Sequence, residues 1–267
     1  MKIYNNISYA DADRLQKLDI YSPENNDAPC PVIIHIHGGA WTYGDKSNEI
    51  NHGKFYCQRG VTVVCINYRL SEEEEVLTKH PTHAEDCASA VAWVYKNIEK
   101  YGGDKDNIFL SGHSSGAHLA TLIATDKRYL NKHNISCKDI TGVIAVDTAA
   151  FNLNSYSYID DTANEQMQSM SKRVKDIFSH EKEQLSNASP LLYVARETCR
   201  KFLIIVSANR PLAKKVSENF VNRLKLAGKE ATLLEVDIND HDEINTAMSL
   251  PNNKVATSIL SFLGLDT

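Results

Sequence analysis

Short runs of apolar and β-branched residues alternate with helical patterns along most of this 267-residue chain. Each run is almost wholly apolar, which is typical of strands that are buried on both faces of a sheet. We expect strands at 32–37, 61–66, 107–111, 142–146, 202–206 and 232–236, with helices at 84–101, 117–124, 213–226 and 255–263. The alternation predicts an α/β fold, a doubly wound and mostly parallel sheet with helices on both faces. The segment 3–21 is expected to add an antiparallel edge.

The segment from about 152 to 196 interrupts this alternation. It is polar and rich in Ser, Asn, Asp, Glu and Tyr, with one amphipathic helical stretch at 167–178. Because long insertions between strands are commonly functional, we expect a single domain over 1–267 with a short helical lid at the C-terminal edge of the sheet. Four aromatic residues then predict a compact pocket for aryl or small acyl groups. They are Trp41, Tyr43, Tyr156 and Tyr158.

Composition and charge argue against several classes of function. The formal net charge is −5 and no basic stripe is present, so a nucleic-acid partner is not expected. No run of 18 apolar residues and no signal-peptide pattern occur, so we expect a cytoplasmic protein without a membrane partner. The six cysteines are scattered, which predicts reduced and mostly buried thiols. The acidic run 72–75 predicts a solvated loop or helix start.

The pentapeptide Gly112-His113-Ser114-Ser115-Gly116 matches the pattern G-x-S-x-G directly between an expected strand and an expected helix. In this context the pattern indicates a nucleophile elbow, a sharp turn that presents the serine above the sheet. The flanking glycines are needed because neighbouring backbone approaches the turn closely. We therefore predict that Ser114 is a catalytic nucleophile.

A second glycine motif, His37-Gly38-Gly39-Ala40-Trp41, ends the first apolar strand. Glycines at such a position let backbone N–H groups converge on one point, as an oxyanion hole requires. The expected donors are the amides of Gly39 and Ala40, together with the amide of Ser115 after the nucleophile.

Other histidines are assigned by their place in the chain. His241 is the last histidine, and it lies between the final expected strand and the C-terminal helix. A histidine at this place, after the nucleophile in the chain, is expected to be the general base.

His35 and His37 alternate along one strand, but metal sites need three or four ligands and the pattern shows no third one. We expect buried, hydrogen-bonded histidines there, and the same for His80 and His83. Neither a metal nor a cofactor is expected.

Together these motifs resemble the α/β-hydrolase family, and within it the kynurenine formamidase (arylformamidase) and small carboxylesterase branch. The matching segments are 18–23, 37–41, 44–46, 86–93, 101–104, 112–119 and 240–241, so the resemblance covers about residues 8 to 263. It implies a hydrolase that cleaves a small ester or an aryl formamide through an acyl-enzyme. Ser114 would attack, His241 would relay the proton, Gly39, Ala40 and Ser115 would hold the oxyanion, and Trp41 would contact the substrate.

The sequence departs from the family at the position of the triad acid. The loop after strand 202–206 carries Arg210 where the family places an aspartate, and a cation beside His241 would disfavour the imidazolium. We therefore expect Arg210 to turn to solvent. Asp147, at the end of the neighbouring strand, is one candidate acid, because some lipases place their acid there. A Ser–His pair without a carboxylate, or orientation of the ring by Asn209, are the alternatives.

Two functions are compatible with these residues. The first is a serine hydrolase for small esters or aryl formamides. The second is a catalytically weak or inactive hydrolase-fold protein that binds a ligand at the former active site, an alternative favoured by the replaced acid.

Overall fold

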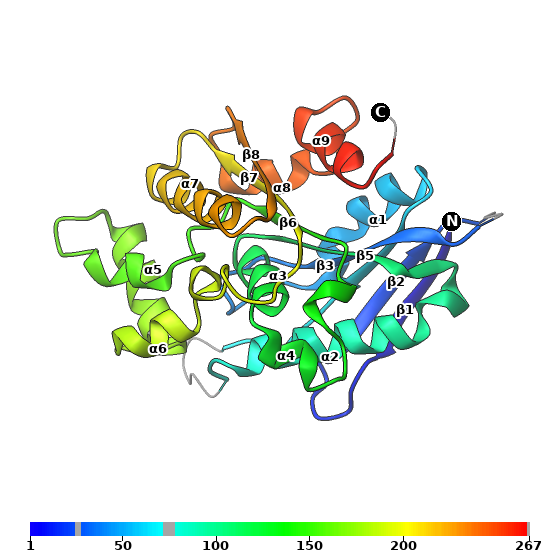
Figure 1. Ribbon diagram of the computed structural model, residues 1–267, viewed down its shortest axis with the longest axis horizontal. Helices are drawn as coiled ribbons and strands as arrows, with labels where there is room; N and C mark the ends of the chain where they lie inside the picture. The colour runs from blue at the N-terminus through cyan, green and yellow to red at the C-terminus, as the bar shows by residue number, and fades with distance from the viewer. Residues whose placement is uncertain (25–27, 72–77, 266–267) are drawn as a thin grey trace.

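A single mixed sheet forms the centre of the molecule (Figure 1). The computed structural model describes residues 1–24, 28–71 and 78–265, so the acidic run 72–75 lies outside the described residues. The sheet has eight strands in the order β1-β2-β4-β3-β5-β6-β7-β8. The strands are β1 (Lys2–Ser8), β2 (Lys17–Ser22), β3 (Cys30–Ile36), β4 (Thr62–Ile66), β5 (Gly103–His113), β6 (Gly142–Val146), β7 (Lys201–Ser207) and β8 (Glu230–Val236).

Strand direction follows the sequence prediction. β3 to β8 pair in parallel, whereas β1 pairs with β2, and β2 with β4, antiparallel. The doubly wound α/β fold with an antiparallel N-terminal edge is thereby confirmed. One boundary was wrong, because the strand expected at 107–111 begins earlier: β5 starts at Gly103, which pairs with Cys30 of β3. A side chain at Gly103 would meet Ile98, so a glycine allows the strand to start this early.

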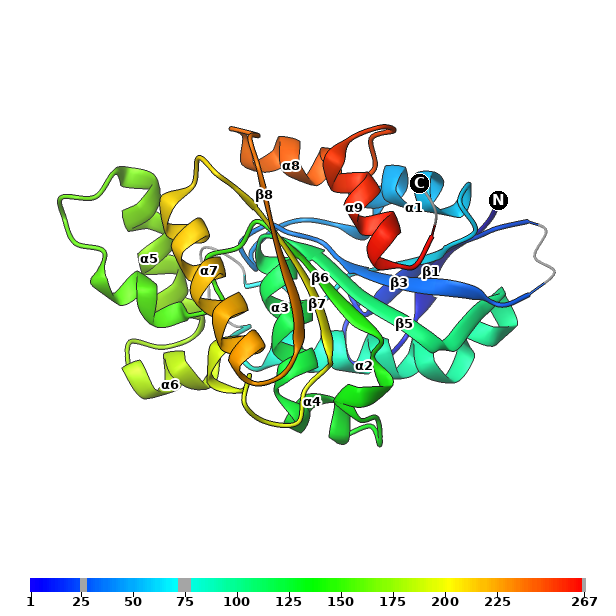
Figure 2. The same ribbon diagram turned by 45° about the horizontal axis from the view of Figure 1, so that its top comes forward.

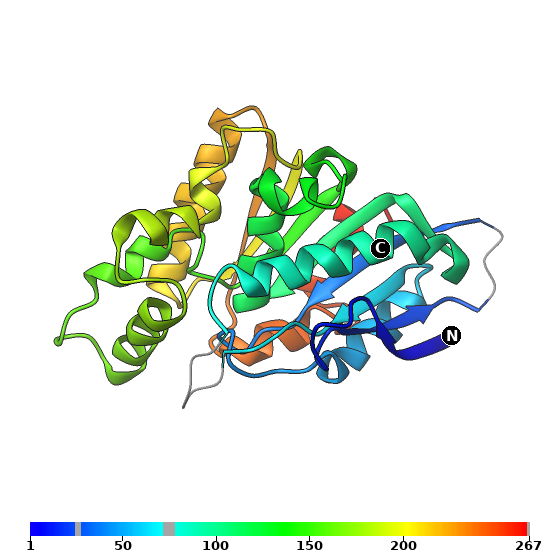
Figure 3. The same ribbon diagram turned by 90° about the horizontal axis from the view of Figure 1, so that it is seen from below.

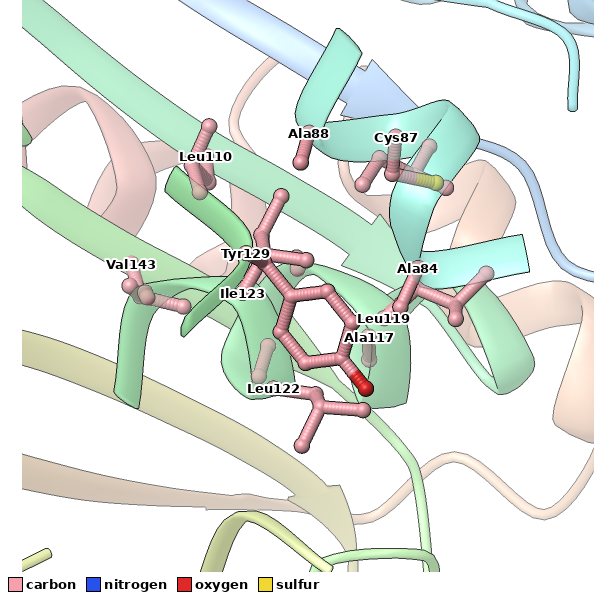
Figure 4. Packing of buried hydrophobic residues seen from close by; sticks show 14 of the residues in the cluster. Ala84, Cys87, Ala88, Leu110, Ala117, Leu119, Leu122, Ile123, Tyr129 and Val143 are labelled. Carbon is pink, nitrogen blue, oxygen red and sulfur yellow. The ribbon is translucent and has the colours of Figure 1, made fainter. Parts of the chain in front are cut away.

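Helices cover both faces of the sheet (Figures 1 and 2). One face carries α2 (Thr82–Asn97), α3 (Ser115–Thr125), α4 (Lys127–Asn131) and α7 (Pro211–Leu226), and the other carries α1 (Ile50–Cys57), α8 (His241–Ala247) and α9 (Lys254–Phe262). Seen from below, α2 crosses the first of these faces (Figure 3). Small residues such as Ala84, Ala88 and Ala117 let α2 and α3 approach β5 closely, and Tyr129 of α4 fills the space beside them (Figure 4).

The segment between β6 and β7 stands apart from these layers, beside α7 (Figure 1). It contains η4 (Leu153–Tyr158), α5 (Glu165–Ile177), α6 (Lys182–Asn187) and η5 (Pro190–Leu192). The expected amphipathic helix is therefore present, and its buried residues include Val174 and Ile177. The ring of Phe178 packs edge-to-face on Trp41 with 4.9 Å between centroids, so the segment contacts the loop after β3.

Two further expectations concern the environment of the chain. All six cysteines are buried and unpaired, as predicted. Among the described helices, none is both long and apolar enough to cross a bilayer. The expected cytoplasmic location stays a prediction.

Candidate active site

Ser114 occupies a strained turn between β5 and α3. Its backbone has φ 56° and ψ −120°, and its N–H donates to the carbonyl of Val146 at 2.9 Å. A non-glycine residue rarely adopts positive φ, so the surrounding structure must enforce the turn. A Cβ on Gly112 would lie 2.4 Å from the carbonyl carbon of Gly116, and one on Gly116 would lie 2.0 Å from the carbonyl oxygen of Ile36. Both glycines are therefore required sterically, as the motif predicts.

The loop after β3 is strained as well. Gly39, Ala40 and Trp41 have φ values of 115°, 47° and 63° in succession. The carbonyl of Gly39 accepts the N–H groups of Thr42 and Tyr43 at 2.9 and 3.1 Å, which closes a tight turn. A Cβ on Gly39 would lie 1.9 Å from the carbonyl oxygen of Tyr43, so no other residue fits there. This geometry is of the kind that turns successive backbone amides toward one point.

Ala40 and Ser115 line the same cavity as Ser114, whereas Gly39 is not among the residues that line it. Ser115 is the first residue of α3, where a helix leaves its N–H groups without intrahelical acceptors. Two of the three residues expected to donate to the oxyanion therefore line the same cavity as Ser114.

Trp41 is fixed by contacts that join three parts of the chain. Its side chain is buried and its indole Nε1–H donates to Nδ1 of His118, on α3, at 3.3 Å. Nε2 of His118 in turn donates to the carbonyl of Ala188 at 2.8 Å. Burial lowers the pKa of His118 to about 3, so the ring is neutral and can play both roles. The loop of Trp41, the helix after the elbow and the segment between β6 and β7 are thus held together.

Asp147 and His241 meet at the C-terminal edge of the sheet, 94 residues apart in the chain. Asp147 follows β6 directly, and its Oδ2 lies 2.7 Å from Nδ1 of His241. Its Oδ1 accepts the backbone N–H of Ser207 at 3.1 Å. His241 begins α8, whose first N–H groups are capped by the carboxylate of Asp240. The structure thus places the carboxylate of Asp147 beside the ring of His241, whereas the carboxylate of Asp240 caps α8.

Arg210 does not turn to solvent, and that expectation was wrong. Its Nη1 donates to the carbonyl of Asp147 at 2.9 Å and to Oδ2 at 2.5 Å, and it lies 2.7 Å from Nδ1 of His241. Two N–H donors cannot bond each other, so this last distance reflects their shared acceptor. The physical reason is the burial of Asp147, because a buried carboxylate is costly unless a cation pairs with it. Asn209 bonds Asp237 and Asn239 instead of the ring.

The charge state of Asp147 follows from these contacts. Burial would raise the pKa of its carboxyl, but the hydrogen bond with His241 and the charge and hydrogen bond of Arg210 outweigh burial and lower it to about 2. Asp147 is therefore ionised at neutral pH, and both of its carboxylate oxygens can accept hydrogen bonds.

His113 is a neighbour that reasoning from the sequence did not single out. Its ring centroid lies 4.3 Å from that of His241, with the planes tilted by 41°. Burial lowers the pKa of His113 to about 3, so it presents a neutral ring to His241. The signal was available, since His113 directly precedes Ser114 in the elbow motif.

A cavity of about 450 Å³ joins these groups. Ser114, Asp147, Arg210 and His241 line it, together with Trp41 and Tyr43 from the loop after β3. The segment between β6 and β7 supplies the opposite wall with Tyr156, Asn164, Met167, Met170 and Arg173. Tyr158 is an exception to the expected aromatic lining, because its side chain is 73% exposed and borders a different hollow on the surface.

The four histidines at positions 35, 37, 80 and 83 are hydrogen-bonded, as predicted; three of them are buried, and His80 is half-buried. Nδ1 of His35 lies 3.2 Å from Oγ of Ser111, and Nδ1 of His37 lies 2.7 Å from the carbonyl of Gly38. His83 contacts Ser71 at 2.9 Å and His80 contacts Tyr129 at 3.3 Å.

Comparison with known proteins agrees with this geometry. Residues 18–224 match the BD-FAE family. Esterase LipQ of Mycobacterium tuberculosis is 30% identical in an alignment that covers 98% of this chain and 62% of LipQ. A probable isoprenylcysteine α-carbonyl methylesterase of Oryza sativa subsp. japonica is 24% identical in an alignment that covers 91% of this chain and 59% of the relative. The chain thus spans about three fifths of these two relatives.

Solved structures show the same fold at lower identity. Esterase B of Lactobacillus rhamnosis superposes with a TM-score of 0.78, at 20% identity over 98% of this chain and 85% of its own. A truncated carbohydrate esterase from gut microbiota superposes with a TM-score of 0.76, at 21% identity over 99% of this chain and 95% of its own.

Proposed function

The chain belongs to the BD-FAE family of α/β hydrolases, and from this premise we propose that it is a serine hydrolase that cleaves small carboxylic esters. One observation carries the proposal: an ionised carboxylate contacts His241 in the cavity that Ser114 of the elbow also lines. Ester hydrolysis by acyl transfer needs a nucleophile, a base oriented by an acid, and donors for the oxyanion.

Each group has a role in this reaction. Ser114 Oγ attacks the ester carbonyl while Nε2 of His241 takes its proton, and a tetrahedral intermediate forms. The amides of Gly39, Ala40 and Ser115 stabilise the negative charge on its oxygen. The protonated His241 then gives the proton to the leaving alcohol, which leaves an acyl-enzyme. Water activated by the same ring hydrolyses the acyl-enzyme and restores Ser114.

Asp147 is the acid in this proposal. It accepts Nδ1–H of His241, which leaves Nε2 free to receive the proton from Ser114, and its charge stabilises the imidazolium. Arg210 keeps Asp147 ionised and in place, although its positive charge offsets part of the stabilisation that the carboxylate gives to the imidazolium. The contact between Asp147 and His241 supports catalysis over the non-catalytic alternative, which rested on a missing acid.

The cavity supports a small acyl group. Its volume of about 450 Å³ lies at the low end of ligand pockets, and Trp41 and Met167 give it an apolar part. The two relatives described above are named as ester hydrolases. Cleavage of aryl formamides stays a prediction.

Hydrolysis of p-nitrophenyl acetate and of an aryl formamide tests the proposal. Replacement His241→Gln keeps the volume of the side chain but removes the proton relay, so ester hydrolysis should fall by about 10³-fold or more. His133→Gln, which changes a half-buried histidine after α4, is the matched control and should retain activity. Wild-type rates in His241→Gln would contradict the mechanism. The formamide assay decides separately whether the enzyme acts on both bonds.

A further inference from the structure

Four polar side chains meet beneath the sheet face that α1, α8 and α9 cover, and we refer to them as the buried histidine–glutamate cluster. They are His35 of β3, Glu49 at the end of η1 (Lys46–Glu49), His52 of α1 and Asn245 of α8. The side chains of His35, Glu49 and His52 are at most 6% exposed, and one nitrogen or oxygen atom from each lies within 4.8 Å of the others. Asn245 is half-buried and lies between this cluster and solvent.

Three separations within the cluster are close to the edge length of a metal tetrahedron. Nε2 of His52 lies 3.1 Å from Oε2 of Glu49 and 3.3 Å from Oδ1 of Asn245, and Nε2 of His35 lies 3.6 Å from Oε2 of Glu49. Ligand atoms about 2.0–2.1 Å from a tetrahedral zinc ion are about 3.3 Å apart. A zinc ion therefore fits among these atoms with small side-chain adjustments.

His35 offers an unused nitrogen to this space. Its Nε2 is buried and lacks a hydrogen-bond partner among the described residues, since 3.6 Å to Glu49 is too long for a hydrogen bond. Its Nδ1 lies 3.2 Å from Oγ of Ser111 and can donate there. That contact leaves a lone pair on Nε2, and an oxygen partner on the second ring nitrogen is the usual support of a metal-binding histidine.

The charge balance also favours a cation. The carboxylate of Glu49 is buried, and its ion-pair partners among the described residues are the imidazoles of His35 and His52. A buried carboxylate without a lysine or arginine partner is costly unless another cation is present.

We propose that the buried histidine–glutamate cluster binds one Zn²⁺ ion through Nε2 of His35, Nε2 of His52, Oε2 of Glu49 and Oδ1 of Asn245. Two imidazoles and a carboxylate suit zinc better than calcium or magnesium, which prefer all-oxygen sites. Without the ion, Nε2 of His52 carries the proton that faces Glu49 and Asn245. When the ion binds Nε2, this proton moves to Nδ1 of the same ring. The site ties α8 to β3 and α1, and His241 begins the same helix four residues before Asn245.

Zinc content and thermal unfolding test this assignment. The full chain is stripped with EDTA, incubated with ZnCl₂ and freed of excess metal, and its zinc is then measured by mass spectrometry. We expect one equivalent of zinc per chain and a rise in Tm of about 5 °C or more with zinc in excess, because an ion that binds the native state stabilises it. Less than one tenth of an equivalent would overturn the proposal.

Three variants distinguish zinc at this cluster from zinc bound at the cavity. Glu49→Gln keeps the shape and the hydrogen bonds but loses the charged ligand, so zinc and the rise in Tm should both disappear. Asn245→Asp adds a second carboxylate, so the metal-free protein should be less stable and zinc should raise its Tm more than that of the wild type. His241→Gln leaves the site intact and should retain the zinc. Loss of zinc from His241→Gln but not from Glu49→Gln would place the ion at Asp147 and overturn the proposal.

Discussion

Two clusters in this molecule each combine two histidines with one carboxylate, yet their surroundings differ. Asp147 and His241 border the cavity and His113 packs against His241, whereas His35, Glu49 and His52 are enclosed beneath the sheet. The first carboxylate has Arg210 as a charged partner, and the second contacts imidazoles and an amide. The neighbouring groups are the basis of the two proposals. The Asp147–His241 pair lies in a cavity that Ser114 also lines and is proposed as a proton relay, whereas the enclosed Glu49 has no lysine or arginine partner among the described residues, and its cluster is proposed as a cation site.

The two clusters share one helix. His241 and Asn245 are one turn apart on α8, and the carbonyl of Met248 after this helix accepts the hydroxyl of Tyr56 at 2.6 Å. Because each cluster includes or contacts a residue of α8, we expect a change in either cluster to shift this helix. The following predictions separate the chemical contribution of the cavity cluster from the structural contribution of the enclosed one.

The largest effect is expected for Ser114→Ala. Removal of the nucleophile should lower kcat/KM for p-nitrophenyl acetate by about 10⁴-fold or more, because the relay has no hydroxyl to activate. Ser89→Ala on α2 is the control and should retain the wild-type rate. A Ser114→Ala enzyme that keeps most of its activity would remove the cavity from the mechanism.

Asp147→Asn and Glu49→Gln compare the two carboxylates directly. Asp147→Asn should lower kcat/KM by about 10²-fold or more, since the amide does not orient His241 in the reactive tautomer and brings no charge. Glu49→Gln should lower it by less than about tenfold, because Glu49 does not line the cavity. The rates are measured on variants shown by circular dichroism to be folded. Equal losses in the two variants would mean that the clusters do not differ as described.

Asp147 should also stabilise the fold in a pH-dependent way. Its pKa is about 2 in the native state against 3.8 as the ordinary value, so the unfolded chain binds more protons between these values. The stabilisation, about 2 kcal/mol, is complete above pH 4 and is lost as pH falls toward 2. Urea unfolding from pH 6 to 2.5 should show a larger loss of stability in wild type and in the surface variant Asp11→Asn than in Asp147→Asn, which lacks the contribution of this carboxylate. Parallel curves for all three proteins would contradict the assigned charge of Asp147.

The smallest effect is expected for the length of the acyl chain. Acetate and butyrate esters of p-nitrophenol should exceed the octanoate ester by about tenfold in kcat/KM, because a cavity of about 450 Å³ closed by Trp41 and α5 has little room for a long chain. A series that peaks at eight carbons or more would show that the segment between β6 and β7 opens further than its contacts suggest.

Local sequence was enough to predict some parts of this site and insufficient for others. The elbow and the turn after β3 could be predicted because their constraint is steric and local: glycine is required where a Cβ would overlap backbone. The partner of His241 could not be chosen, because Asp147 reaches it only when β6 and α8 meet at one edge of the sheet. Arg210 was wrongly assigned to solvent because a sequence shows a charge but not the buried carboxylate that attracts it.

The same limit applies to the enclosed cluster. His35 was noticed, but no third ligand could be seen, because Glu49 of η1 and His52 of α1 reach His35 of β3 only through tertiary packing. Residues that act together across elements are therefore the part of this molecule that required the structure.

Labelling with a fluorophosphonate tests the catalytic role of Ser114 most directly, because the reagent reports an activated serine without requiring the natural substrate. We predict one adduct per chain by intact mass, located at Ser114 by peptide mapping, and slowed by about 10²-fold or more in Asp147→Asn. Labelling should be unchanged in the control Ser89→Ala. A folded protein that is not labelled at Ser114, or that is labelled equally fast without the Asp147 carboxylate, would contradict the proposed mechanism.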